Sequence, residues 1–231
     1  MDVTQEVNLA IVELWRQTFE EGTDVLLPLI YPKIKKSGIL FIGLNPSFNA
    51  RGIRNLINGT ELESIDIDKF YHYRNIDNYN LETAQKIVKL SRDNYPYFRK
   101  FQVIAQHIKT DWEHIDLYFY PETTQRNIRG MINNNNPANF WVEQLKLSKK
   151  LIIEAEPIII VVANAYASQI FQIEFDAKPN EEKICYEIKL NNKTLPVFLG
   201  GMLTGQRALD NYSFERLKWV ISKLLKASKD E

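Results

Sequence analysis

A polar turn follows the first strongly apolar segment of the chain. The segment Gly38–Gly43 is apolar throughout, and Asn45-Pro46-Ser47 end the pattern abruptly. This pattern predicts a strand buried on both faces with a polar turn at its carboxyl end. Open α/β sheets bind ligands at that edge, so we expect Asn45, Pro46 and Ser47 to line a functional site.

Three further polar or glycine-rich turns follow predicted strands. We expect these strands at His114–Tyr120, at Pro157–Ala163 and in the second arm of a hairpin that runs from Ile184 to Leu199. The turns after them are Glu122-Thr123-Thr124-Gln125, Asn164 and Gly201-Met202-Leu203-Thr204-Gly205. Because the carboxyl ends of parallel strands meet at one edge of a sheet, the four turns are expected to share a crevice.

Several kinds of chemistry find no support in the sequence. No turn carries GxGxxG, a Walker lysine or GxSxG, which argues against dinucleotide, P-loop nucleotide and α/β-hydrolase sites. The single cysteine, Cys185, and the three histidines show no metal-ligand spacing, so we expect neither a metal nor a cofactor. The 29 basic and 29 acidic side chains cancel, which leaves only local patches to attract a polyanion.

The remaining pattern alternates strands with helices. Helical periodicity is clear over about Thr4–Glu20, Leu81–Arg92, Phe140–Ile152 and the last helix around Phe214–Leu224, whereas residues 49–80 look irregular and are interpreted as a long loop or lid. This order predicts an α/β fold: a three-layer α/β/α sandwich with a central four-stranded, mostly parallel sheet and a C-terminal hairpin arm. We expect one domain over 1–231, with 1–37 forming an N-terminal helix and connection.

The location is predicted from what the sequence lacks. No run of about 18 apolar residues occurs, and the N-terminus has no signal-peptide pattern. We therefore expect a cytoplasmic protein that makes no membrane contact. We also expect it to be a monomer.

Gly43-Leu44-Asn45-Pro46-Ser47 resembles the G-[ILM]-N-P-[GS] first motif of the uracil-DNA glycosylase superfamily, especially its mismatch-specific and single-strand-selective branches. Asn94-Tyr95-Pro96-Tyr97-Phe98 is similar to the helix start that follows in those branches. Leu203–Leu209 lies where the family carries its second active-site motif. The resemblance covers residues 38 to 225 and implies a uracil-DNA glycosylase-like fold.

The resemblance implies a hydrolase of base-excision DNA repair that needs no cofactor. Its partner would be uracil-containing or mismatched DNA, single- or double-stranded, from which a flipped base is removed by cleavage of the N-glycosidic bond. Asn45 would hold the attacking water, and backbone N–H groups between Leu44 and Ser47 would face the departing base. The resemblance and the neighbouring loop suggest a base pocket of Gly43, Leu44, Pro46, Ser47, Phe48, Tyr71, Tyr73 and Asn164, with one aromatic ring stacking on the base.

The second motif departs from the family pattern. Many members have His-Pro-Ser there, whereas this chain has Gly201-Met202-Leu203-Thr204-Gly205. Thr204-Gly205 would stand in for the Ser-Gly of the mismatch-specific branch, Met202 and Leu203 are wedge candidates for the gap left by a flipped base, and Arg207 is a candidate phosphate contact.

Each of these features has a structural alternative. Asn45 could satisfy its own turn, Asn164 could cap the helix after it, and Arg207 could pair with Asp210. The aromatic residues Phe70 to Tyr73 could be core or lid packing. The alternative function is a non-catalytic member of the same fold that binds nucleic acid, a nucleobase or a protein.

Overall fold

The computed structural model describes residues 2–36, 38–205 and 208–227, which gather into two compact units. Unit 1 comprises Met1–Ile34, Asn45–Tyr95 and Asp116–Glu154, and unit 2 comprises Lys35–Leu44, Pro96–Ile115 and Ala155–Glu231. Each unit is built from three separate segments of the chain, and each is described by itself.

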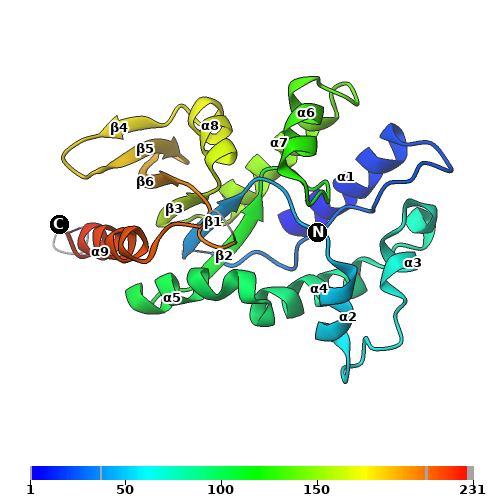
Figure 1. Cartoon of the computed structure of the whole chain (residues 1–231). Coiled ribbons are helices and arrows are strands. Elements are labelled where there is room, and N and C mark those ends of the chain that lie inside the picture. The colour runs from blue at the N-terminus through cyan, green and yellow to red at the C-terminus, as the bar shows by residue number, and fades with distance from the viewer. Residues whose placement is uncertain (1, 37, 206–207, 228–231) are drawn as a thin grey trace. The chain divides into compact units, whose positions relative to one another are not determined.

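A six-stranded mixed sheet in the order β2-β1-β3-β6-β5-β4 forms the centre of unit 2 (Figure 1). Its strands are β1 (Ile39–Gly43), β2 (Trp112–Asp116), β3 (Ile159–Ala163), β4 (Lys178–Asn180), β5 (Cys185–Leu190) and β6 (Lys193–Gly200). β3 runs parallel to both β1 and β6, with Leu40 opposite Ile160 and Val162 opposite Leu199. β5 is antiparallel to β4 and β6, so the hairpin enters the main sheet and extends it beyond the four strands expected.

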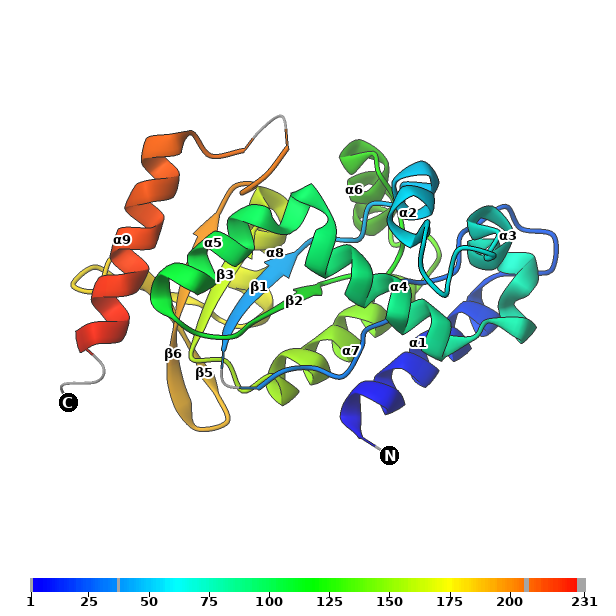
Figure 2. The same ribbon diagram turned by 90° about the horizontal axis from the view of Figure 1, so that it is seen from below.

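Helices cover both faces of this sheet (Figure 2). α5 (Arg99–Ile108) and α9 (Asn211–Ala227) lie on one face, and α8 (Ala165–Glu174) lies on the other, against β3 and β6. Phe41 and Phe101 meet edge to face at 4.7 Å in the core between β1 and α5. The α/β class predicted from the sequence is therefore confirmed.

Unit 1 is helical. It contains α1 (Val3–Thr18), α2 (Ala50–Ile57), α3 (Ile67–Tyr71), the 3-10 helix η1 (Tyr73–Asn78), α4 (Leu81–Asn94), α6 (Gln125–Asn133) and α7 (Phe140–Glu154). α1 packs along α7, where the rings of Trp15 and Phe140 meet edge to face at 4.8 Å, and α2 packs on α4. The apolar stripe of α1 thus finds its partner in α7.

The irregular region expected at residues 49–80 is helical, because α2, α3 and η1 form there. Each has a side-chain cap: Asn49 accepts from the Gly52 N–H, Asp66 from the Lys69 N–H, and His72 from the Arg74 N–H. These helices have 8, 5 and 6 residues, too few turns for a clear apolar period. A long irregular loop is therefore the wrong description of this region.

β2 ends four residues earlier than predicted. The apolar residues after Asp116 leave the sheet and pack among the helices of unit 1, where Phe119 meets Tyr31 edge to face at 5.7 Å. The Phe119 N–H donates to Gln144 Oε1 at 2.8 Å. A side chain of α7, and not a neighbouring strand, therefore accepts this hydrogen bond.

A buried polar cluster lies within unit 1. The Asp116 N–H donates to Tyr31 Oη at 2.8 Å, and the Tyr31 hydroxyl lies 3.5 Å from Asp116 Oδ2. Burial raises the pKa of the Asp116 carboxyl to about 7 and that of Tyr31 well above its usual range, and it lowers the pKa of Arg92 to about 10.

Within the described ranges, no helix is both long and apolar enough to cross a membrane. No group of three or more His, Cys, Asp or Glu side chains in those same ranges is arranged to hold a metal ion.

Gly38→Ala is expected to destabilise the protein by about 1–3 kcal/mol, because its new Cβ would lie 2.4 Å from the backbone oxygen of Asp111. Gly130→Ala, inside α6, is the matched control. Its Cβ would meet no atom within 4 Å, so we expect a gain of a few tenths to about 1 kcal/mol. Urea denaturation measures both, and equal stability of the two variants would contradict the close approach of Gly38 to Asp111.

Asp116 is expected to make the protein less stable as the pH rises from about 4 to 7. The folded state keeps the Asp116 proton up to about pH 7, whereas the unfolded carboxyl ionises near pH 4. Its stabilising contribution is therefore complete below pH 4 and is lost at up to about 1.4 kcal/mol per pH unit as the pH rises. Comparing unfolding free energies at pH 5 and pH 8 should show a smaller loss for Asp116→Asn than for the wild type. Equal losses would contradict this assignment.

Candidate functional site

The Asn45 side chain fastens the turn after β1 to the chain segment after β2. Its Nδ2 donates to the backbone oxygens of Glu122 at 2.7 Å, Pro46 at 3.1 Å and Tyr120 at 3.2 Å. Three carbonyl oxygens around one nitrogen also fix the orientation of the amide, since the opposite orientation would place Oδ1 against three acceptors. All four residues belong to unit 1.

Further hydrogen bonds hold the same two segments together. The Glu122 N–H donates to the Pro46 oxygen at 3.1 Å, and Ser47 Oγ donates to Thr123 Oγ1 at 3.3 Å. Thr123 Oγ1 in turn donates to the Phe48 oxygen at 3.2 Å. We call Asn45–Phe48 and Tyr120–Thr123, joined in this way, the Asn45 clamp.

The Asn45 clamp leaves both an acceptor and donors unused. Among the described residues, none donates a hydrogen bond to Asn45 Oδ1, and the Ser47 and Phe48 N–H groups find no acceptor. Asn45 is half-buried and Ser47 is exposed. The clamp can therefore accept a hydrogen bond from a water through the amide oxygen and donate to an anionic group through backbone N–H groups.

Phe48 joins the clamp to an aromatic cluster. Its ring meets Tyr71 edge to face at 5.3 Å, and Tyr71 also contacts Phe70 and Tyr79. Tyr71 is 0% exposed, burial raises its pKa, and its hydroxyl has no hydrogen-bond partner among the described residues. Of Phe48 and Tyr71, only the half-buried Phe48 has ring surface left for a ligand.

Tyr73 lies in a different cluster from Tyr71. Its ring meets Phe19 edge to face at 6.0 Å, and its hydroxyl donates to the Phe19 backbone oxygen. The structure thus brings Tyr71, but not Tyr73, against Phe48.

Unit 2 holds the other residues expected in the site. Gly43 and Leu44 are buried at the end of β1. Asn164 follows β3 and caps α8, because its Oδ1 accepts from the N–H groups of Tyr166 and Ala167 at 2.9 and 3.0 Å. The capping alternative for Asn164 is therefore confirmed.

The loop after β6 corrects one expectation. Leu203 is 2% exposed and belongs to the core cluster with Phe41 and Phe214, so it is unavailable as a wedge. Met202 is half-exposed, and its backbone oxygen accepts from the Leu209 N–H at 2.9 Å. Gly201 is also half-exposed, and Gly205 adopts a φ of +93°, which favours glycine.

Thr204 Oγ1 is buried without a hydrogen-bond partner among the described residues. Arg207, the candidate phosphate contact, lies outside those residues.

Glu122 was not expected to contact Asn45. Its backbone oxygen accepts from Asn45, while its carboxylate accepts from the Thr124 N–H at 2.6 Å and Asn127 Nδ2 at 3.4 Å at the start of α6. The only sequence feature that pointed to Glu122 as a site residue was its place in the polar turn after β2. The pairing itself depends on three-dimensional folding and has no signature in the sequence.

No model of a known protein family matches this sequence, and no curated protein matches it.

Asn45→Asp is expected to destabilise the protein more than Asn45→Ala at pH 7. Aspartate would place a charged acceptor against three carbonyl oxygens, whereas alanine only removes the donor, at about 1–3 kcal/mol. Ser47→Ala, which loses one exposed hydrogen bond of 3.3 Å, serves as the control and should cost less than about 0.5 kcal/mol. Urea denaturation at pH 7 measures the three variants, and a fully stable Asn45→Asp would contradict the orientation of the amide.

Proposed function

We propose that this protein is a DNA glycosylase of the uracil-DNA glycosylase type, which hydrolyses the N-glycosidic bond of a flipped uracil or another deaminated or mispaired base. The observation that carries the proposal is the Asn45 clamp. In the clamp, the Nδ2 of Asn45 makes the structural hydrogen bonds, and Oδ1 has no partner among the described residues.

The chemistry fits that arrangement. Breaking an N-glycosidic bond builds positive charge on the sugar and negative charge on the departing base. An amide oxygen can orient a water without being a strong base. It would therefore raise the rate by holding the water in place, and the clamp supports this because it fixes the amide. The Ser47 and Phe48 N–H groups are suited to the developing negative charge, and Phe48 offers a ring on which a base can stack.

The finer fold assignment belongs to the same proposal. We interpret β2-β1-β3-β6 as the four-stranded sheet of a uracil-DNA glycosylase-like three-layer sandwich, with β5 and β4 as an extension. Support comes from the parallel pairing around β3 and from the position of Gly43-Leu44-Asn45-Pro46-Ser47 at the end of β1.

Incubation with oligonucleotides tests the activity directly. Single strands and duplexes should carry uracil in every pairing, hypoxanthine or xanthine, and abasic sites are detected by alkaline cleavage. We expect product from at least one substrate, and Asn45→Ala should lower the single-turnover rate by about 10²-fold or more. Phe48→Ala should weaken substrate binding, since stacking contributes about 1–3 kcal/mol.

Asn75→Ala is the matched control, because it removes an asparagine side chain outside the Asn45 clamp whose Nδ2 makes one structural hydrogen bond, to the Phe70 backbone oxygen at 3.1 Å. Rates are compared at equal folded fraction, so that a loss of stability in Asn45→Ala is not counted as a loss of chemistry. If no substrate is cut at high enzyme excess, the proposal fails and the non-catalytic binding role takes its place.

A further inference from the structure

The outer face of α9 carries aromatic and basic side chains in one row. The row consists of Tyr212, Arg216, Trp219, Lys223 and Lys226, which we call the α9 stripe. At 3.6 residues per turn these positions fall within about 80° of one another around the helix, and at 1.5 Å per residue they span about 21 Å.

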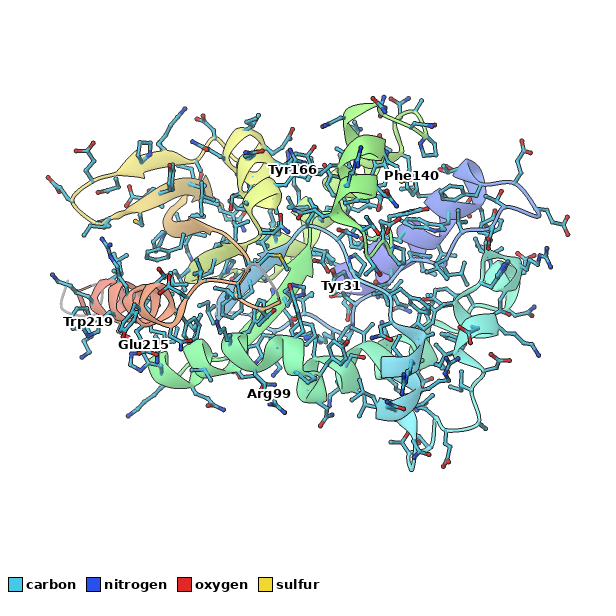
Figure 3. All side chains as sticks on the ribbon, viewed as in Figure 1. Tyr31, Arg99, Phe140, Tyr166, Glu215 and Trp219 are labelled. Carbon is cyan, nitrogen blue, oxygen red and sulfur yellow. The ribbon has the colours of Figure 1, made fainter. Side chains whose placement is uncertain are left out.

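The α9 stripe faces away from the core. Tyr212 is 88% exposed and Trp219 is 78% exposed, and Figure 3 shows Trp219 on the side of α9 away from the sheet. The opposite side of the helix is committed to the core, where Phe214 and Ile221 are buried with Phe101 of α5. Packing therefore fixes which face of α9 meets solvent.

The exposed face of α9 is basic. Arg216, Lys223 and Lys226 form no ion pair with any described residue. The neighbouring Glu215 is already engaged, since its carboxylate lies 2.8 Å from Lys218 Nζ. A sequence with equal numbers of acidic and basic residues thus presents a local group of cations here.

We propose that the α9 stripe binds a single-stranded segment of nucleic acid. Bases would stack on Tyr212 and Trp219, and phosphates would lie against Arg216, Lys223 and Lys226. Alternating planar rings and cations match a ligand that alternates bases and phosphates. The inference extends the proposed function to the strand outside the base pocket, but it concerns binding and does not require cleavage.

The geometry favours nucleic acid over a lipid surface. A helix that lies on a membrane inserts its apolar face into the lipid. In α9 that face is occupied by the core, and the stripe offers only two rings separated by charged side chains.

Fluorescence anisotropy with labelled, undamaged 12-mers of deoxycytidine and of cytidine tests the proposal, and the two sugars distinguish DNA from RNA. We expect Trp219→Ala and Tyr212→Ala each to weaken binding by about 5- to 100-fold. Arg216→Gln, Lys223→Gln and Lys226→Gln combined should reduce the slope of log affinity against log salt by about 2, because three phosphate contacts are lost.

Two control variants carry matched changes elsewhere in unit 2. Ile173→Ala removes an equally exposed apolar side chain from α8, and Lys178→Gln, Lys189→Gln and Lys193→Gln remove three charges from the hairpin strands. Both controls should bind like the wild type.

Wild-type affinity in the stripe variants would overturn the proposal, as would binding to phosphatidylserine vesicles without binding to either 12-mer. Because the 12-mers contain no damaged base, their binding does not test the glycosylase proposal, and either proposal can fail without the other. Wild-type binding of the 12-mers together with no excision of any base would remove the glycosylase proposal and leave the α9 stripe proposal in place.

Discussion

The hydrogen bonds from Asn45 Nδ2 to three backbone oxygens are the interaction on which the candidate site depends. They join two segments 75 to 77 residues apart in the chain and fix the amide at the middle of Gly43-Leu44-Asn45-Pro46-Ser47. An asparagine suits this position because a single side chain donates through its nitrogen and accepts through its oxygen. The nitrogen is committed to structural hydrogen bonds, and the oxygen is left for the water that we propose.

The segments that meet in the clamp are themselves positioned by burial. β1 is buried along its whole length, and Gly38 before it lies against the Asp111 backbone, where no side chain fits. The segment after β2 is held by Gln144 through the Phe119 N–H and by α6, whose first turn binds the Glu122 carboxylate. The clamp thus connects two segments that have little freedom of their own.

The sequence predicted the α/β class, the parallel strands β1, β3 and β6, and the long helices. Long apolar segments and helical periods are local signals. The sequence prediction missed α2, α3 and α6, whose short lengths give weak periodicity, and it placed the end of β2 too late because buried apolar residues such as Phe119 look alike in a strand and among helices. The turn at Asn45 was visible in the sequence. Its partners at Tyr120 and Glu122, and the burial of Leu203, follow from tertiary packing.

The α9 stripe could not be predicted from the sequence either. Helical periodicity identified the core face of the last helix, but the same pattern gives no reason to single out the outer residues. Exposure of Tyr212 and Trp219 becomes informative only once Phe214 and Ile221 are known to fix the rotation of the helix.

The most direct test of hydrolysis by a water that Asn45 holds follows the oxygen atom of that water. Uracil-containing DNA is incubated with the protein in water enriched in oxygen-18, and the free base and the abasic sugar are examined by mass spectrometry. The proposed hydrolysis predicts release of free uracil without the label, because the water attacks the sugar carbon and not the base, and Asn45→Ala should release far less. Label in the base, or no base release at all, would contradict it.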